Sequence, residues 1–139
     1  MEDVVRSIQI AFAVAGGFLG AFLGGLDGML YALIGFVAVD YVTGVTAALA
    51  EKKLSSQVGF KGIAQKLMIF ALVGIGHVID SKLIGAGSTV RTAVTMFYLS
   101  NEGISITENA ARIGLPLPKK LKNVLLQLKS EAPDGAPDE

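Results

Sequence analysis

The stretch that decides the fold runs from Ser7 to Leu26 and reads SIQIAFAVAGGFLGAFLGGL, twenty residues without a charged side chain. Asp27 ends this run, and Gly28 to Ala50 then adds twenty-three residues of which only Asp40 is charged. The hydrocarbon core of a bilayer is about 30 Å thick, and a helix needs roughly 20 apolar residues to cross it. Two such segments begin a chain of 139 residues. The sequence therefore predicts an all-α integral membrane protein.

The composition of the whole chain supports this class. Hydrophobic residues make up 52% and the mean hydropathy is +0.58, which is high for a soluble domain. Lys plus Arg and Asp plus Glu number 12 each, so the net charge favours no nucleic-acid partner. Cysteine is absent, which excludes disulfides, thiolate catalysis and cysteine-ligated metals.

Two further segments complete the predicted topology. The expected spans are residues 7–26, 28–50, 63–79 and 89–113, all within a transmembrane domain of residues 1–114. The third span is short, and it crosses comfortably if Lys66 extends to the interface. The fourth is interrupted by charged residues, so three spans plus an amphipathic or interfacial helix is the alternative. Residues 80–88 are expected to form a turn. Residues 115–129 are expected to form a basic cytoplasmic amphipathic segment, and 130–139 a disordered acidic tail.

The distribution of basic residues predicts the orientation. Lys and Arg concentrate on the cytoplasmic side of membrane proteins. Four spans with both termini inside leave only Lys82 and Arg91 outside. The basic residues that this arrangement places inside are Arg6, Lys52, Lys53, Lys61, Lys66, Arg112, Lys119, Lys120, Lys122 and Lys129. The reverse orientation would invert this split and is disfavoured.

Glycines recur at four-residue steps, at Gly16, Gly20, Gly24 and Gly28. Residues four apart share a helix face, and glycine there lets two backbones approach closely. Two interpretations are open: packing within one protomer, or a homo-oligomer interface. Gly24 to Gly28 could instead belong to the turn between two spans.

Asp40 lies near the middle of the second span, with Thr43 one turn later on the same face. A carboxylate at the bilayer centre costs several kcal/mol, so it should face protein or water. It is either a hydrogen-bonded anchor, paired with Lys66 or His77, or part of an aqueous pathway.

The fourth segment carries a polar stripe at three- and four-residue steps. Such a stripe lines a water-filled lumen, lies at the membrane surface, or forms a structural ion-pair network that includes Glu108. The residues of this stripe are Arg91, Thr95, Tyr98, Glu102, Ser105, Asn109 and Arg112. No arrangement of residues resembles a catalytic or cofactor site, and His77 with Asp80 is a poor metal pair. We expect neither an enzyme nor a bound metal or cofactor.

Three motifs resemble the phage holins of the toxin-secretion and phage-lysis type. DYVTG at residues 40–44 resembles the family's D-x-x-T-G, and SSQVGFKGI at 55–63 is similar to its S-x-x-G-x-K-G. NEGISITENAARIGLPLPKKL at 101–121 resembles the run from NEG-x-SI-x-EN to G-x-P-x-P. The resemblance covers roughly residues 5 to 129. Two features depart from it: the acidic end of the chain, and the absence of a second Met close to Met1.

The resemblance implies a function. Holins oligomerise in the bacterial cytoplasmic membrane and open lesions that release an endolysin, and relatives beside toxin genes are associated with toxin export. The implied partners are further copies of the chain and membrane lipids, with a functional but not direct link to endolysin or toxin and none to nucleic acid. Polar residues such as Asp40 and Glu102 would be satisfied inside a closed protomer and line water after assembly. The alternatives are an antiholin, or a small-solute or ion channel or transporter.

Overall fold

The computed structural model describes residues 1–131, and their side chains as far as Gln127. This part of the chain is helical and contains no strand, as the sequence predicts. Its elements are α1 (Glu2–Phe22), α2 (Gly28–Ala50), α3 (Ser56–Val78), the π-helical η1 (Ile79–Ile84), α4 (Thr89–Arg112) and α5 (Lys119–Glu131).

The first helix ends earlier than the apolar run does. α1 stops at Phe22, and Gly24 and Gly25 adopt φ values of 84° and 98°. Glycine tolerates this left-handed region because it has no Cβ. Asp27 then caps α2 by accepting a hydrogen bond from the Leu30 amide at 2.9 Å. The prediction of a helical span to residue 26 is therefore wrong, and Gly24 does not share a helix face with Gly16 and Gly20.

The third helix is longer than its apolar part. It begins at Ser56 because the Ser55 hydroxyl caps it, accepting from the Val58 amide at 3.2 Å. At its other end the chain continues as η1, in which the Gly85 amide donates to the Asp80 carbonyl at 2.8 Å. The turn predicted for residues 80–88 is thus confined to the residues after Ile84. Gly85 and Gly87 end the helix with φ values of 84° and 77°.

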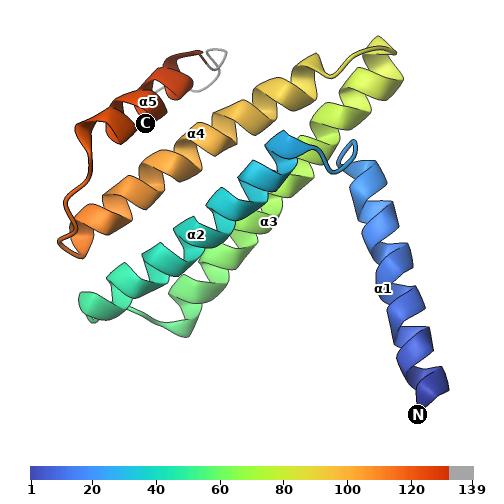
Figure 1. Cartoon of the computed structure of the whole chain (residues 1–139), viewed down its shortest axis with the longest axis horizontal. Coiled ribbons are helices and arrows are strands. Elements are labelled where there is room, and N and C mark those ends of the chain that lie inside the picture. Colours follow the sequence, from blue (N-terminus) through green and yellow to red (C-terminus); the bar gives the residue numbers. More distant parts are fainter. Residues whose placement is uncertain (132–139) are drawn as a thin grey trace.

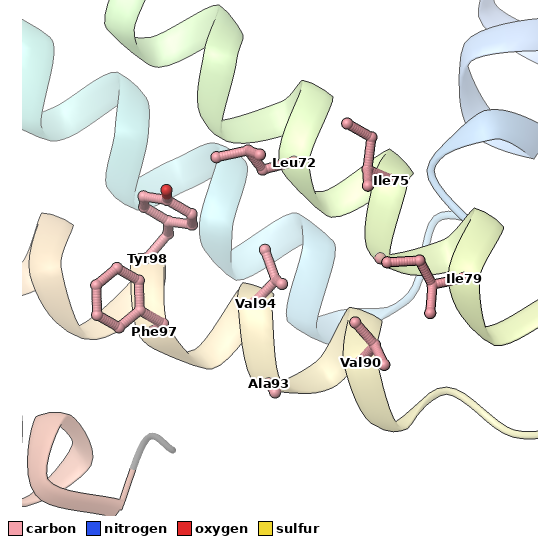
Figure 2. A pocket seen from close by; sticks show the side chains of 9 residues that line it. Leu72, Ile75, Ile79, Val90, Ala93, Val94, Phe97 and Tyr98 are labelled. Atoms are coloured by element: carbon pink, nitrogen blue, oxygen red, sulfur yellow. The ribbon is translucent and has the colours of Figure 1, made fainter. Parts of the chain in front are cut away.

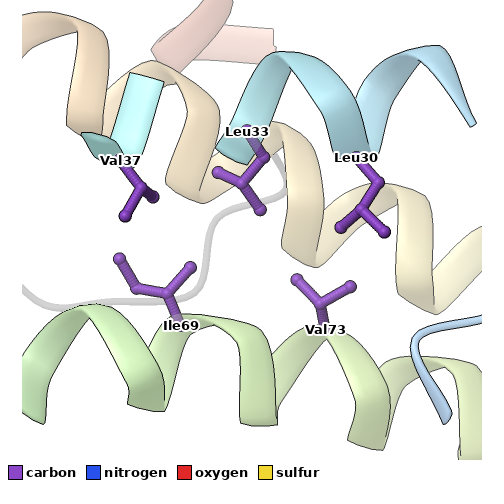
Figure 3. Close-up of a cluster of buried hydrophobic side chains, with 5 residues drawn as sticks. All are labelled: Leu30, Leu33, Val37, Ile69 and Val73. Carbon is purple, nitrogen blue, oxygen red and sulfur yellow. The ribbon is translucent and has the colours of Figure 1, made fainter. Parts of the chain in front are cut away.

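Helices α2, α3 and α4 lie side by side, α5 folds back along α4, and α1 diverges from this bundle (Figure 1). The apolar core lies between α2 and α3 (Figure 3). Its fully or nearly buried side chains are Leu30, Leu33, Val37, Ile69 and Val73. Within residues 1–131 no residue of α1 is fully buried, and α1 contacts α3 through Phe22 at its end. Burial of apolar area therefore fixes α2 against α3 and leaves α1 outside the bundle.

Most of the buried side chains of α4 are polar. The Thr95, Ser100 and Thr107 hydroxyls donate to carbonyls three or four residues earlier, at 2.6–2.8 Å. Among the described residues no buried side-chain nitrogen or oxygen lacks a partner. By length and composition the described helices that could cross a membrane are Glu2–Phe22, Gly28–Ala50 and Ser56–Ile84. α4 is not among these candidate spans because its sequence is too polar, although the neighbouring helices cover most of its polar side chains.

Contacts of α4 define two ends of the bundle. Arg112, the last residue of α4, pairs with Glu51 at the end of α2, and we call this end, with the loop 51–55 and the segment 113–118, the basic end. Arg91 in the first turn of α4 binds the turn at 23–27, and we call this end, with the loop 85–88, the turn end. The N-terminus of α1 points toward the level of the basic end (Figure 1). α5 reaches Glu131, two residues into the segment predicted to be disordered, and residues 132–139 of that segment lie outside the described residues.

Candidate functional site: a buried ion network

Three helices each contribute one charged side chain to the centre of the bundle. Lys66 of α3 contacts the Asp40 carboxylate of α2, and its Nζ lies 2.5 Å from Oε2 of Glu102 on α4. Asp40 and Glu102 are 5% and 6% exposed. The lysine is one of the two partners that the sequence analysis allowed for Asp40. It does not extend to the interface as expected, because both carboxylates hold it inside the bundle.

Asn109 of α4 donates to the carboxylate oxygen of Asp40 that Lys66 does not contact. Its Nδ2 donates to Asp40 Oδ1 at 2.9 Å and to Thr43 Oγ1 at 3.1 Å. Gly44 lies beside the same nitrogen, since a Cβ added there would be in ordinary van der Waals contact with it, at 3.5 Å. The D-x-x-T-G motif thus supplies two acceptors and the space for the α4 amide that joins them.

A chain of polar contacts leads from this centre to the basic end. Asn109 Oδ1 accepts from Arg112 Nη1 at 3.2 Å, and the Arg112 guanidinium binds both Glu51 oxygens at 3.0 and 2.9 Å. The hydrogen bond from Arg112 lowers the pKa of the Glu51 carboxyl below its usual value. Exposed Glu51 is therefore linked to buried Glu102 through four intervening side chains.

The central group carries unequal charge. One ammonium faces two carboxylates, which leaves a net negative charge at a buried position when all three are ionised. Burying such a charge away from water is costly unless it is paired, takes up a proton or is reached by water. The structure provides access on two sides of Lys66. A cavity of about 420 Å³ reaches Lys66 and Asp40, and one of about 290 Å³ reaches Lys66 and Glu102.

A second group of charged residues holds the turn end together. Arg91 donates from Nε to the Leu23 carbonyl at 2.6 Å and from Nη2 to the Gly25 carbonyl at 2.9 Å, and its Nη1 lies 2.7 Å from Asp27 Oδ2. This guanidinium lowers the pKa of the Asp27 carboxyl. Asp80 caps α4 by accepting from the Val90 and Arg91 amides at 3.0 and 2.8 Å. Sequence reasoning missed the roles of Asp27 and Asp80.

The predicted polar stripe of α4 divides into three parts. Arg91, Thr95, Glu102 and Asn109 are buried, Tyr98 and Ser105 are partly buried, and Arg112 lies at the basic end. The buried part is satisfied within one protomer. Glu108, predicted as a possible member of an ion-pair network, is exposed and lines a cavity between α4 and α5.

The predicted glycine stripe faces open space where it is helical. A Cβ added at Gly16 would meet no described atom within 4 Å, and one at Gly20 would only touch Leu26 at 4.0 Å. Gly28 begins α2 and is equally open. Packing of this stripe within the described protomer is therefore not observed.

Known proteins are similar to this chain over much of its length. A profile of the bacteriophage holin family matches residues 17–130. The chain belongs to the bacteriophage holin family. It is 40% identical to an uncharacterized protein of Listeria innocua over 96% of this chain and 93% of that protein. It is also 33% identical to a protein named probable holin from Bacillus phage phi105, over 67% of this chain and 68% of that protein. No solved structure matches.

The match assigns the ion network to the holin part of the chain. Asp40, Lys66, Glu102 and Asn109 all lie within residues 17–130, whereas most of α1 precedes that range. In this holin the segment resembling NEG-x-SI-x-EN contributes Glu102 and Asn109 to the network. It also contributes Gly103, where a Cβ would lie 2.6 Å from Leu125 Cδ2 of α5. The segments that resemble D-x-x-T-G and NEG-x-SI-x-EN therefore meet in space, at the centre of the helical bundle.

Proposed function

We propose that this holin assembles in the bacterial cytoplasmic membrane and that the assembly opens a lesion through which an endolysin, or a toxin, leaves the cell. The observation that carries the proposal is the Asp40–Lys66–Glu102 network. In this member of the holin family, three adjacent helices each place one charged side chain inside the bundle. Without the neighbouring helices, these side chains would face lipid.

The proposed topology has four crossings with both termini in the cytoplasm. The basic end groups Lys52, Lys53 and the lysines that begin α5, in line with the excess of basic residues on the cytoplasmic side. Helix α4 crosses as the fourth span because α2, α3 and α5 cover its polar residues. A reporter fused after Lys129 is expected to remain in the cytoplasm.

The network suits a protein with two arrangements. In the protomer each charged group is paired inside the bundle. If the helices separate, the same groups cannot face hydrocarbon and must face water. An assembly in which α2, α3 and α4 move apart is therefore compatible with the bilayer only if these faces line an aqueous opening. The ion network thus favours two states, a closed protomer and an open assembly.

Induced expression in a bacterium tests this proposal. Cultures with and without a cytoplasmic endolysin are followed by optical density and membrane potential. We expect abrupt depolarisation at a set time, with lysis only when endolysin is present. Glu102→Gln should shift that time, whereas Glu108→Gln, at an exposed position of the same helix, should leave it unchanged.

Continued growth with intact potential would contradict the proposal. It would favour an antiholin, or a small-solute or ion channel or transporter. Unchanged timing in both Asp40→Asn and Glu102→Gln cells would contradict the part assigned to the network.

A further inference from the structure

A seam runs along α3 and α4, and at the basic end it is bordered by α2 as well, through Tyr41, Gly44 and Val45. It is hollowed at three successive places, with volumes of about 420, 290 and 310 Å³ from the basic end to the turn end. The first two share Gln65 and Lys66, and the last two share Tyr98. Along α3 the lining changes from Lys61 and Gln65 to wholly apolar side chains.

The apolar third of the seam is the hollow in Figure 2. Leu72, Ile75 and Ile79 form one wall, and Val90, Val94 and Phe97 form the other. The walls come from α3, η1 and α4 alone, so α2 does not close the hollow. A seam of this length facing lipid on a membrane protein is suited to receive another helix.

The chain also contains a helix that lacks such a partner. α1 is 21 residues long, and within the described residues none of its side chains is fully buried; it contacts α3 through Phe22 at its end. At about 100° per residue, one of its faces carries no large apolar side chain. This smooth face consists of Glu2, Arg6, Gln9, Ala13, Gly16 and Gly20.

The smooth face and the seam match in length and polarity. A 21-residue helix is about 32 Å long, and α3 from Lys61 to Ile79 is nearly as long. Both are polar at the basic end and become apolar or small toward the turn end. The match requires that α1 of one copy and α3 of the other run in the same direction through the membrane. This condition is met when both copies are inserted with the same orientation, because α1 and α3 both run toward the turn end.

The structure indicates that the docked helix comes from another copy. Arg91 binds the carbonyls of Leu23 and Gly25, and the Phe22 ring packs on Gly74 of α3. These contacts fix the end of α1 while the rest of the helix diverges from its own bundle (Figure 1). With this anchor in place, the N-terminal half of α1 is directed toward a neighbouring molecule.

We propose that the smooth face of α1 docks in the α3–α4 seam of a second copy of this chain. The inference rests on the proposed assembly and names the surfaces that form it. The contact between Phe22 and Gly74 places these two residues at the same depth in the membrane in every copy. This fixes which residues of α1 and of the neighbouring α3 lie opposite each other. Counting back equally along the two parallel helices places Ala13 opposite Gln65 and Gln9 opposite Lys61.

Cysteine pairing in membranes tests this register directly, because the chain has no cysteine of its own. Ala13→Cys in one copy and Gln65→Cys in a differently tagged copy are co-expressed and oxidised. Both positions are exposed, so the substitutions spare the core. We expect a disulfide-linked product carrying both tags. Ala11→Cys is the matched control, because residue 11 lies on the opposite face of α1, and its yield should be at least several-fold lower.

Equal yields from Ala13→Cys and Ala11→Cys would overturn the proposed face. The pair Gln9→Cys and Lys61→Cys tests the register independently, and failure of both pairs to link would overturn the docking. An intramolecular disulfide in the Ala13→Cys, Gln65→Cys double variant, without products that carry both tags, would overturn the second copy as the source.

The lysis assay separates this inference from the proposed function. Each single-cysteine variant is assayed with endolysin under reducing conditions, which also establishes that it inserts and acts. Normal lysis without linked products would refute the docking and leave the proposed function standing. Linked products with neither depolarisation nor lysis would support the docking and contradict the proposed function.

Discussion

Replacing Lys66 by methionine should be the most damaging single substitution in the bundle. Methionine keeps the length and volume of the side chain but removes the only cation in contact with Asp40 and Glu102 among the described residues. Both carboxylates would remain at 5% and 6% exposure without a counter-charge. Breaking a buried ion pair by removing one partner costs about 3–5 kcal/mol. Because two carboxylates lose their partner here, we expect a loss of unfolding free energy in the upper part of this range.

The measurement is reversible unfolding in detergent micelles, followed by helical circular dichroism. A loss of about 3–5 kcal/mol lowers the folded-to-unfolded ratio roughly a hundredfold to a few thousandfold. Lys61→Met is the matched control, because Lys61 is exposed on the same helix and should change stability by less than about 1 kcal/mol.

A triple variant separates charge from packing. Lys66→Met combined with Asp40→Asn and Glu102→Gln removes all three charges while keeping the side-chain shapes. Replacing a buried ionic group by neutral groups of similar volume is often neutral or stabilising, so this variant should recover most of the loss. Equal stability of the Lys66→Met and Lys61→Met proteins would refute the account of the network, as would a triple variant no more stable than Lys66→Met.

Two further predictions concern the turn end. Gly76→Ala should lower the free energy of unfolding by about 1–3 kcal/mol, because the added Cβ would lie 3.0 Å from the Arg91 Cα, a backbone atom that cannot rotate away. Gly16→Ala is the control and should leave the free energy of unfolding unchanged in the same detergent assay, because no described atom lies within 4 Å of its added Cβ. Equal losses in the two variants would contradict the prediction. Arg91 lowers the Asp27 pKa below 3.8, so the stability that this pair contributes is fully present above that pH and is lost as Asp27 becomes protonated below it. The difference in thermal midpoint between wild type and Asp27→Asn should therefore be constant from about pH 5 to 7 and shrink at lower pH, and a difference that changes within that range would contradict the assignment.

The helices could be predicted wherever apolar residues run on, but their ends depend on local signals of another kind. α1 ends inside its apolar run because Gly24 and Gly25 turn the chain and Asp27 caps the next helix. α3 begins before its apolar run because Ser55 caps it. Hydropathy counts residues that can lie in lipid, whereas a helix begins and ends where backbone groups find other partners. The glycine pair and the capping residues can be recognised in the sequence, and they predict the end of α1 and the start of α3 better than hydropathy does.

The site was predictable as a set of residues and not as a set of contacts. Asp40, Lys66 and Glu102 stand out because charge in an apolar segment demands a partner. Their pairing depends on which faces of three helices meet, and residues 26 and 36 positions apart give no local sign of that. The turn end offered a clearer clue. With four spans, Arg91 and Asp27 fall at the same membrane surface, in segments where few charges of either sign occur.

The two charged groups contribute differently to the proposed opening. Arg91 and Asp80 bind backbone carbonyls and amides at the turn end, so releasing them would leave helix ends and a turn without partners. The Asp40–Lys66–Glu102 contacts join side chains only, and water could replace each partner without breaking any helix. Separation of α2, α3 and α4 should therefore begin at the central network and the basic end while the turn end stays intact. In that order of events the contacts of Arg91 with the Leu23 and Gly25 carbonyls survive, and α1 stays attached to its own bundle at the turn end as the lesion forms.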